Sequence, residues 1–327
     1  MLPGKVPPGL LARLLSILPI GEDVLIGPGE GLDFAALMAD GRIIVASTDP
    51  ITGAEKRIGF YAVHVNANDV AVSGARPRWF LTTILLPEDA DEGLAERIVA
   101  EIAENAEKIG VSVVGGHTEV TPGLNRPIVV GTMIGVAGER LVRPDGAMPG
   151  DAIVLTKWAG LEGTAIIAEE RWEELVGLFG EEFLGRATGF LEMISVLPEA
   201  MVAGDFARAI HDPTEGGIAN GLHEMANSAG LGFRVYAERI PIREETEKIC
   251  GFYSLNPLAL ISSGALLIAV PPGDSGKLVA RLREKGIPAT VIGEFLEDSD
   301  RRVIVENGWE RPLERPASDE LWKVVGG

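Results

Sequence analysis

The sequence predicts a globular protein of two domains, each containing both helices and strands. Its 327 residues exceed the usual size of one domain and suit two domains of roughly 150 residues each. Hydrophobic residues make up 46% of the chain and charged residues 24%, which excludes wholesale disorder. Residues 143–151 contain two prolines and two glycines and are the best candidate for the boundary. We therefore expect domains at 1–145 and 146–327.

The hydrophobic pattern of the first half switches between the periods of helices and strands. We expect helices over residues 10–20, 57–73 and 91–109, and strands over 42–47, 79–86, 111–114 and 128–136. The first of these strands is expected to end at Thr48-Asp49-Pro50. The third is expected to run into a glycine-rich turn at 115–119.

The second half shows the same mixture. We expect strands over residues 152–156, 233–236, 265–270, 290–293 and 303–305, and helices over 218–228 and 276–285. The uncharged stretch 255–273 is interrupted by prolines and glycines, which favours a buried strand with turns over a membrane span. We expect a soluble, cytoplasmic protein.

Charge and cysteine content narrow the function classes. Lys and Arg number 29 against 48 Asp and Glu, so the formal net charge is −19. Such a chain repels phosphate backbones, which argues against a nucleic-acid partner and against a polybasic membrane module. The only cysteine is Cys250, so neither an intrachain disulfide nor a cysteine-rich zinc site can form. If the protein handles phosphate, a positive charge must screen the phosphate from these carboxylates, and a divalent metal ion is the natural candidate.

The common nucleotide and hydrolase motifs are absent, and one acidic pattern remains. Acidic residues stand where a strand is expected to end or a glycine-rich turn to begin a helix: Asp33, Asp49, Asp69 and Asp212. Magnesium takes hard oxygen ligands, usually one or two carboxylates completed by phosphates and waters. Asp is also common in turns and at helix N-caps, so spacing alone leaves both interpretations open.

Five segments resemble one known superfamily. Residues 66–77, which begin Asn66-Ala67-Asn68-Asp69, resemble the helix signature of the superfamily that contains aminoimidazole ribonucleotide (AIR) synthase, HypE, selenophosphate synthetase and thiamine-monophosphate kinase. The version in HypE, a hydrogenase-maturation protein, is the most similar. Further matches lie at residues 27–37, 47–49, 114–118 and 212–219, so the five segments occur in the same order as in the family. The resemblance covers about residues 24–270.

The resemblance implies a two-domain AIR-synthase-like α+β fold. Its N-terminal domain would pair with a second copy through a shared sheet or barrel, and its C-terminal α/β domain would close over the site. It also implies ATP and Mg²⁺, with phosphate transferred to, or through, an amide-type or phosphate-bearing small substrate, in connection with hydrogenase or cofactor maturation.

The resemblance also assigns residues to roles. The metal-side residues are Asp33, Asp49, Asp69 and Asp212. Asp69 and Asp212 would also take part in catalysis, together with His117. The residues beside the nucleotide and its phosphates are Gly27, Gly29, Gly31, Asn68, Gly115 and Gly116.

Two departures from HypE limit what is implied. HypE-like enzymes end in a cysteine that accepts the carbamoyl group, whereas residues 321–327 contain none, so carbamoyl dehydration on the chain's own tail is not expected. HypE has Asp where this chain has His117. Imidazole is a poor magnesium ligand, so His117 would contact phosphate or substrate, with Glu119 as a replacement carboxylate, or would be purely structural.

Two other functions remain open. One is a non-catalytic HypE-like assembly partner of other maturation proteins, and the other is a small-molecule kinase of the thiamine-monophosphate kinase type. Lys157 would either reach an anionic substrate or lie exposed in solvent. Cys250 is expected to be buried and inert. His64, His211 and His223 are interpreted as packing residues.

Overall fold

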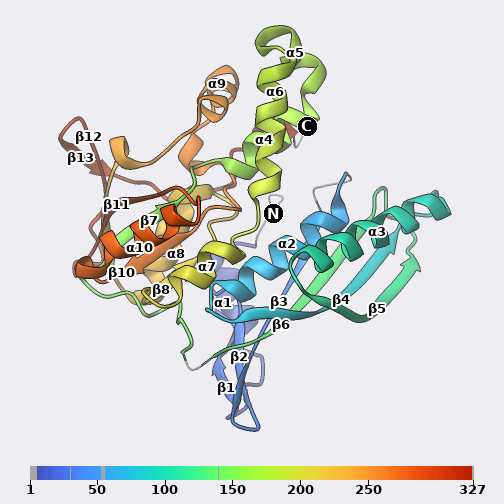
Figure 1. Ribbon diagram of the computed structural model, residues 1–327, viewed down its shortest axis with the longest axis horizontal. Helices are drawn as coiled ribbons and strands as arrows, with labels where there is room; N and C mark the ends of the chain where they lie inside the picture. Colours follow the sequence, from blue (N-terminus) through green and yellow to red (C-terminus); the bar gives the residue numbers. More distant parts are fainter. Residues whose placement is uncertain (1–5, 30, 53–55, 139, 326–327) are drawn as a thin grey trace. The chain divides into compact units, whose positions relative to one another are not determined.

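The computed structural model describes residues 6–29, 31–52, 56–138 and 140–325. The chain divides into two compact units (Figure 1). The N-terminal unit comprises residues 19–28 and 33–141. The rest of the described chain, which includes residues 29–32 and everything from Val142 onward, forms the C-terminal unit.

A six-stranded sheet forms the N-terminal unit. Its strands are β1 (Val24–Ile26), β2 (Ala35–Ala39), β3 (Arg42–Ile51), β4 (Arg76–Leu86), β5 (Ser112–Val120) and β6 (Ile128–Val136). Their order across the sheet is β1-β2-β3-β6-β4-β5. Neighbouring strands are antiparallel except β4 and β5, which are parallel and joined through helix α3 (Glu92–Lys108), as a parallel pair requires.

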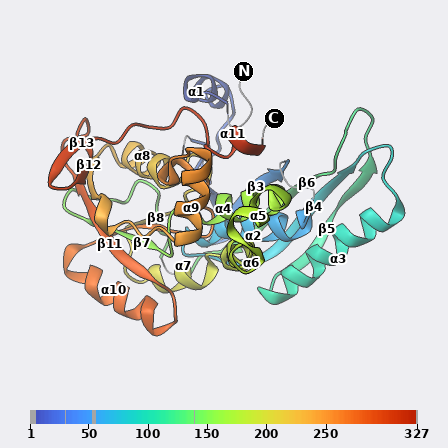
Figure 2. The same ribbon diagram turned by 90° about the horizontal axis from the view of Figure 1, so that it is seen from above.

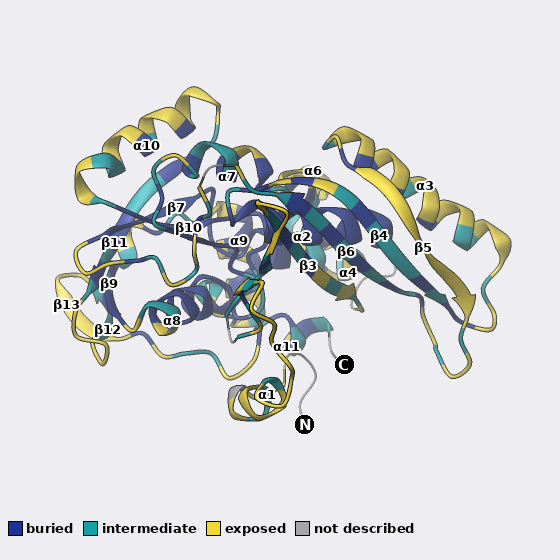
Figure 3. Ribbon diagram, turned by 90° about the horizontal axis from the view of Figure 1, so that it is seen from below, coloured by how far each residue is buried: buried dark blue, intermediate teal, exposed yellow. Residues whose placement is uncertain are grey.

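Helices α2 (Ile58–Ala71) and α3 cover one face of this sheet (Figures 1 and 2). Residues of β6 alternate between buried and half-buried, as expected for a strand covered on one face only. The half-buried residues are mostly apolar: Ile128, Val130, Thr132, Ile134 and Val136. Strand β5 at the edge is exposed along its whole length (Figure 3). The sheet therefore keeps an apolar face that neither helix covers.

A seven-stranded sheet forms the centre of the C-terminal unit. Its strands are β7 (Ala152–Thr156), β8 (Ala209–His211), β9 (Gly232–Tyr236), β10 (Leu267–Val270), β11 (Ala289–Leu296), β12 (Arg302–Glu306) and β13 (Trp309–Pro312). The order is β13-β12-β9-β11-β7-β10-β8, and only β12 and β9 are parallel. Strands β7 and β10 are buried at every residue, so helices must cover both faces there.

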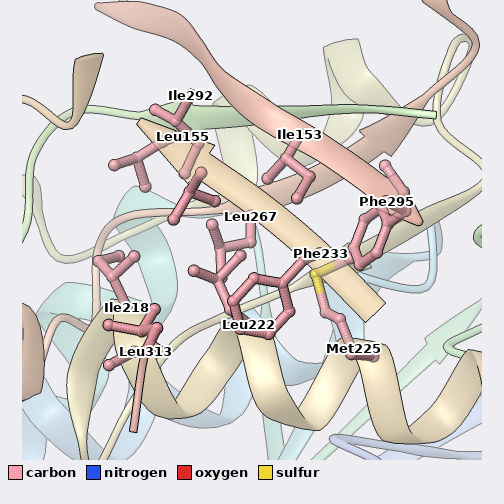
Figure 4. Packing of buried hydrophobic residues seen from close by; sticks show 14 of the residues in the cluster. Ile153, Leu155, Ile218, Leu222, Met225, Phe233, Leu267, Ile292, Phe295 and Leu313 are labelled. Atoms are coloured by element: carbon pink, nitrogen blue, oxygen red, sulfur yellow. The ribbon is translucent and has the colours of Figure 1, made fainter. Parts of the chain in front are cut away.

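Helix α8 (Gly217–Ala229) packs its apolar side on this sheet (Figure 4). Ile218, Leu222 and Met225 recur at helical spacing and meet sheet residues such as Phe233 and Leu267. Helices α7 (Leu197–Ala203) and α10 (Pro272–Glu284) contact each other, and α10 packs on β7 and β11.

A separate helical cluster completes the C-terminal unit. It contains α4 (Leu161–Glu170), α5 (Trp172–Phe179), α6 (Glu181–Thr188), α9 (Glu244–Tyr253) and the short C-terminal α11 (Trp322–Val325). Its buried residues include Ile167, Leu175, Leu184, Ile249 and Leu321. Helix α1 (Pro8–Leu15) contributes little to either core, because most of its residues are exposed.

Most predicted elements occur within a few residues of their expected bounds, but strands β3 and β5 extend well past the ends expected for them. Strand β3 continues through Asp49 and Pro50 because residues 48–51 pair with β6. Pairing with β2 ends at Ala46, so Pro50 lies where β3 has a single neighbour, a position that proline tolerates. Strand β5 continues through 115–119 because these residues pair with β4. The predicted turn at 115–119 is therefore wrong.

The uncharged stretch 255–273 contains a 3₁₀ turn (Pro257–Ala259) and strand β10. Among the helices in the described ranges, none is long and apolar enough to cross a membrane.

Candidate functional site

The side chain of Asn66 on helix α2 forms hydrogen bonds with strand β3. Its Oδ1 accepts a hydrogen bond from the backbone N–H of Asp49 at 2.8 Å, and its Nδ2 donates to the carbonyl of Asp49 at 3.3 Å and to that of Ala62 at 2.9 Å. The side chain is fully buried. Gly131 on β6 makes room for it, since a Cβ there would lie 2.4 Å from Nδ2. The backbone of Asp49 is therefore held in a fixed position beside α2.

Asp69 is held from the same strand. The hydroxyl of Ser47 donates to Asp69 Oδ2 at 2.7 Å, and Asp69 is only 5% exposed. Asn66 and Asp69 are three residues apart on α2, which places both on the side of the helix that meets β3. Asn68, between them, is also completely buried. Two of the predicted acidic residues thus lie on neighbouring elements that polar contacts join.

This pair suits a hard cation that completes its shell with phosphate and water. Among the residues described, no group of three or more His, Cys, Asp or Glu has the arrangement of a metal site made of protein ligands alone. Magnesium bound to a nucleotide does not need such a group, because one or two carboxylates suffice. Asp49 and Asp69 supply oxygen donors of that kind. The donor chemistry therefore fits magnesium. The expectation that each aspartate stands where a strand ends or a glycine-rich turn begins a helix is wrong for these two, because Asp49 lies within β3 and Asp69 within α2.

The glycine-rich segment is divided between the units. Gly27 and the half-buried Asp33 belong to the N-terminal unit, and Gly29 and Gly31 to the C-terminal unit. Gly31 has φ +70°, and a Cβ there would lie 3.0 Å from the Cβ of Glu224 on α8. Close packing and a left-handed backbone therefore explain this glycine without reference to a phosphate.

His117 and Glu119 form an exposed pair on β5. His117 Nε2 lies 3.0 Å from Glu119 Oε2, and the hydroxyl of Thr121 donates to Glu119 Oε1 at 2.9 Å. These contacts, that of His117 first, hold the pKa of Glu119 below its usual value. Gly115 and Gly116 precede the pair in the extended strand. A Cβ at Gly116 would lie 2.0 Å from the carbonyl oxygen of Thr82, so strand pairing alone requires this glycine.

Asp212 lies in the C-terminal unit, directly after β8. It is 1% exposed, and the loop that follows it leads through Gly216 into α8. The preceding His211 is also buried, with Nε2 3.0 Å from Glu224 Oε2. Arg315 approaches the other oxygen of Glu224 at 3.9 Å. The loop therefore begins beside a buried network of acidic and basic groups.

Sequence reasoning missed several of these polar contacts. The spacing of Asn66 and Asp69 was a usable signal, because residues three apart share a helix face. Nothing local marks Ser47 as the partner of Asp69 or Glu224 as the partner of His211. Both contacts depend on how strands and helices pack.

Lys157 and Cys250 are both buried. Neither proposed role of Lys157 is correct: its Nζ donates to the carbonyls of Met193, Ser195 and Gly264 at 2.7–2.9 Å and lies 2.7 Å from Glu199 Oε1. Burial raises the pKa of Cys250 to about 12, so this thiol is unreactive, as expected.

The Lys157–Glu199 pair lines a cavity of about 580 Å³ in the C-terminal unit. Met193, Met201 and Lys285 also line it. None of the residues predicted to bind metal or nucleotide lines this cavity.

Each unit mixes helices and strands, which defines a two-domain α+β protein. The N-terminal unit carries Asp49 and Asp69 on neighbouring elements, and the C-terminal unit carries the buried Asp212 before a glycine turn. Residues 31–137 match the family model for the N-terminal domain of AIR synthase related proteins, and residues 148–306 match the model for their C-terminal domain. The chain belongs to the AIR synthase related family.

Relatives named HypE resemble the chain over most of its length. Carbamoyl dehydratase HypE of Rhodobacter capsulatus is 32% identical over 307 residues, which cover 91% of this chain and 84% of that protein. A solved structure of hydrogenase maturation protein HypE in complex with ATP has a TM-score of 0.72 and 26% identity, and covers 96% of this chain and 91% of its own. A chain of a HypE–HypF complex has a TM-score of 0.71 and 25% identity, with coverage of 86% and 93%.

Proposed function

We propose that this protein is an enzyme that uses ATP and Mg²⁺ to transfer phosphate to, or through, an amide-type or phosphate-bearing small substrate, in hydrogenase or metal-cofactor maturation. The observation that carries the proposal is the pair of contacts in the N-terminal unit, Ser47 to Asp69 and Asn66 to Asp49. Likeness to a HypE structure in complex with ATP over 96% of the chain supports the choice of nucleotide.

The chain's own residues have distinct tasks in this proposal. Asp49 and Asp69 would hold magnesium, and Asp33 and Asp212 are further candidate ligands. When bound, magnesium would screen the phosphate oxygens and spread the charge that develops on the transferred group. Ser47 and Asn66 hold β3 and α2, which carry the two proposed ligands, in fixed positions relative to each other. Nucleotide binding would therefore lose little conformational entropy in ordering these elements.

His117 is proposed as a contact to phosphate or substrate. Its side chain is 64% exposed, and its partner Glu119 shares its side of the strand, since side chains two residues apart point the same way. A neutral imidazole can donate or accept a hydrogen bond, but it is a poor ligand for magnesium.

Asp69→Asn tests the metal assignment. The replacement amide keeps an oxygen for the Ser47 hydroxyl, so the fold should persist, while the negative charge is lost. We expect ATP turnover to fall about 100-fold or more, the effect of removing one group that stabilises a transition state. Calorimetry should also show weaker binding of Mg²⁺-ATP.

Asp89→Asn is the matched control, because Asp89 is an exposed aspartate of the same unit. Its turnover and binding should equal those of the wild type. Unchanged turnover in Asp69→Asn would remove Asp69 from the metal site. If the wild type shows no heat of ATP binding, the protein is instead a non-catalytic HypE-like assembly partner.

We also propose that the protein forms a homodimer through the N-terminal unit. Within the described part of the chain, no strand pairs with the outer side of β5, and Val113, Val114 and Val120 are 46–56% exposed. The half-buried residues of β6, which is separated from β5 by β4, add further apolar area to the same sheet. A long exposed edge strand invites pairing with another strand, and a second copy of this chain offers an identical one.

Light scattering coupled to size exclusion tests the dimer. The wild type should have twice the 34.7 kDa mass of one chain. Val114→Lys should shift the mass toward a single chain, because lysine on an edge strand opposes pairing. The control Val99→Lys alters an equally exposed valine on α3 and should remain dimeric. A wild type that is monomeric at micromolar concentration contradicts the proposal.

A further protein partner is proposed on the likeness to the HypE–HypF complex. Such a partner fits either the enzyme or the assembly protein, so calorimetry with ATP, rather than partner binding, decides between them.

A further inference from the structure

The C-terminal segment 313–321 runs along helix α8. His223 Nε2 bonds with the carbonyl of Leu313 at 2.8 Å, and Arg315 Nε donates to Asn220 Oδ1 at 2.8 Å. At the helix start, the N–H of Gly216 donates to Asp319 Oδ2 at 2.5 Å. These contacts follow the helix from its middle back to its first turn, where the loop from Asp212 enters.

Asp319 binds the backbone N–H of the residue just before helix α8. Gly216 is the N-cap residue of α8, has φ +78° and carries no side chain that could accept a hydrogen bond. Asp319, 103 residues away in the sequence, accepts from Gly216 and also from the N–H groups of Leu321 at 2.8 Å and of Ile261. A carboxylate that accepts three N–H bonds at a helix N-terminus is well placed to be ionised.

Glu162 introduces a second buried carboxyl at this place. It is the second residue of α4, is 5% exposed and accepts a hydrogen bond from Ser263. Its Oε2 has no hydrogen-bond partner among the residues described. The charged groups that act on Glu162 are Asp319 and Glu215, both negative. Two ionised carboxylates here would repel each other in a poorly solvated environment.

We propose that Glu162 holds a proton that allows Asp319 to remain ionised, and that Asp319 is thereby the positioning residue for the loop between Asp212 and α8. The proton belongs on Glu162 because Asp319 has three N–H donors and Glu162 has one hydroxyl donor. The contact between Asp319 and Gly216 does not depend on the proposed function. Only the effect of this contact on nucleotide binding rests on the proposed function.

Burial and the neighbouring charges agree with this assignment. Burial, with added repulsion from Asp319 and Glu215, raises the pKa of Glu162 to about 7. Burial raises the pKa of Asp319 to about 6, against the opposing effect of its N–H donors, with Glu215 adding to the rise. The proton therefore leaves Glu162 last, close to neutral pH.

Hydrogen exchange in the ligand-free full chain tests the proposal. If opening of the segment hydrates Glu162, the closed state binds the proton more tightly than the open state. Protection of peptides over 211–220 and 313–325, corrected for the intrinsic pH dependence of exchange, should then fall about tenfold between pH 6 and 8 and no further above pH 8.

The variants separate the two carboxyls. Glu162→Gln should remove most of the fall with pH, and the control Glu170→Gln, at an exposed position of the same helix, should retain it. Asp319→Ala should show low protection at every pH, and Asp319→Asn should restore part of it. A constant wild-type protection, or an equal fall in Glu162→Gln, overturns the proposal.

ATP calorimetry on the same proteins separates the two proposals. If the wild type binds no ATP, the proposed function fails while the exchange result stands. If ATP binds, Asp319→Ala should weaken binding and Glu170→Gln should not.

Discussion

Lys157→Met is expected to destabilise the C-terminal unit more than most single substitutions. Lys157 and Glu199 are 8% and 1% exposed, and Nζ lies 2.7 Å from Oε1. Methionine matches the length of the lysine stem but removes the ammonium group. Glu199 then loses its counter-charge, and three backbone carbonyls lose their donor.

The magnitude follows from breaking a buried ion pair on one side. Such a change costs about 3–5 kcal/mol in the free energy of unfolding, because an uncompensated charge is left in the interior. Burial already raises the pKa of Glu199, and Lys157 opposes that rise. Without Lys157 the pKa of Glu199 rises further, so the loss of stability should be smaller at pH 5 than at pH 8.

Urea unfolding at pH 5 and pH 8 measures both effects. Lys285→Met is the matched control, because Lys285 lines the same cavity but is exposed, and its effect should stay within about 0.5 kcal/mol. A loss below about 1 kcal/mol in Lys157→Met at pH 8 would refute the reasoning. An equal loss at the two pH values would show that Glu199 does not take up a proton.

Two further stability predictions follow from the structure. Because the pKa of Glu162 is raised to about 7, its contribution to the free energy of unfolding is fully present below pH 4.5 and is lost as pH rises through about 7. In urea unfolding, the stability of Glu162→Gln relative to the wild type should therefore increase by about 3 kcal/mol between pH 4.5 and pH 8. An unchanged difference between the two proteins across that range would contradict this. Gly131→Ala should lower the melting temperature because its Cβ would displace the Asn66 side chain. An unaltered melting curve would show that Asn66 can move aside without loss of stability.

Elements with a clear hydrophobic period could be predicted from the sequence. Strands β6 and β7 have the expected bounds, and helices α3 and α8 differ by a residue or two at each end. Buried strands and amphipathic helices reveal themselves because each side chain's environment repeats along the chain.

The ends of β3 and β5 could not be predicted in the same way. Asp, Pro and Gly disfavour strands locally, yet Asp49 and Gly116 pair within the sheet. Pairing with β6 and β4 outweighs the local preference. The same pairing turns the expected phosphate loop at 115–119 into an exposed edge strand.

The acidic candidate site was predictable only in part. Asp69 and Asn68 were found through a motif, and the structure adds that Ser47 and Asn66 hold the aspartates at 69 and 49. Lys157 was misjudged because nothing in the sequence around it indicates that Glu199, 42 residues later, will accept its charge.

The sequence alone determined the family, the positions of most long helices and strands and the excess of carboxylates, because composition, period and motif do not depend on the tertiary structure. Tertiary structure alone decided which polar groups meet: Ser47 with Asp69, Lys157 with Glu199, and Asp319 with the start of α8. Partners of buried polar groups are selected by packing between elements far apart in the chain, and the need to satisfy each buried group then fixes the geometry.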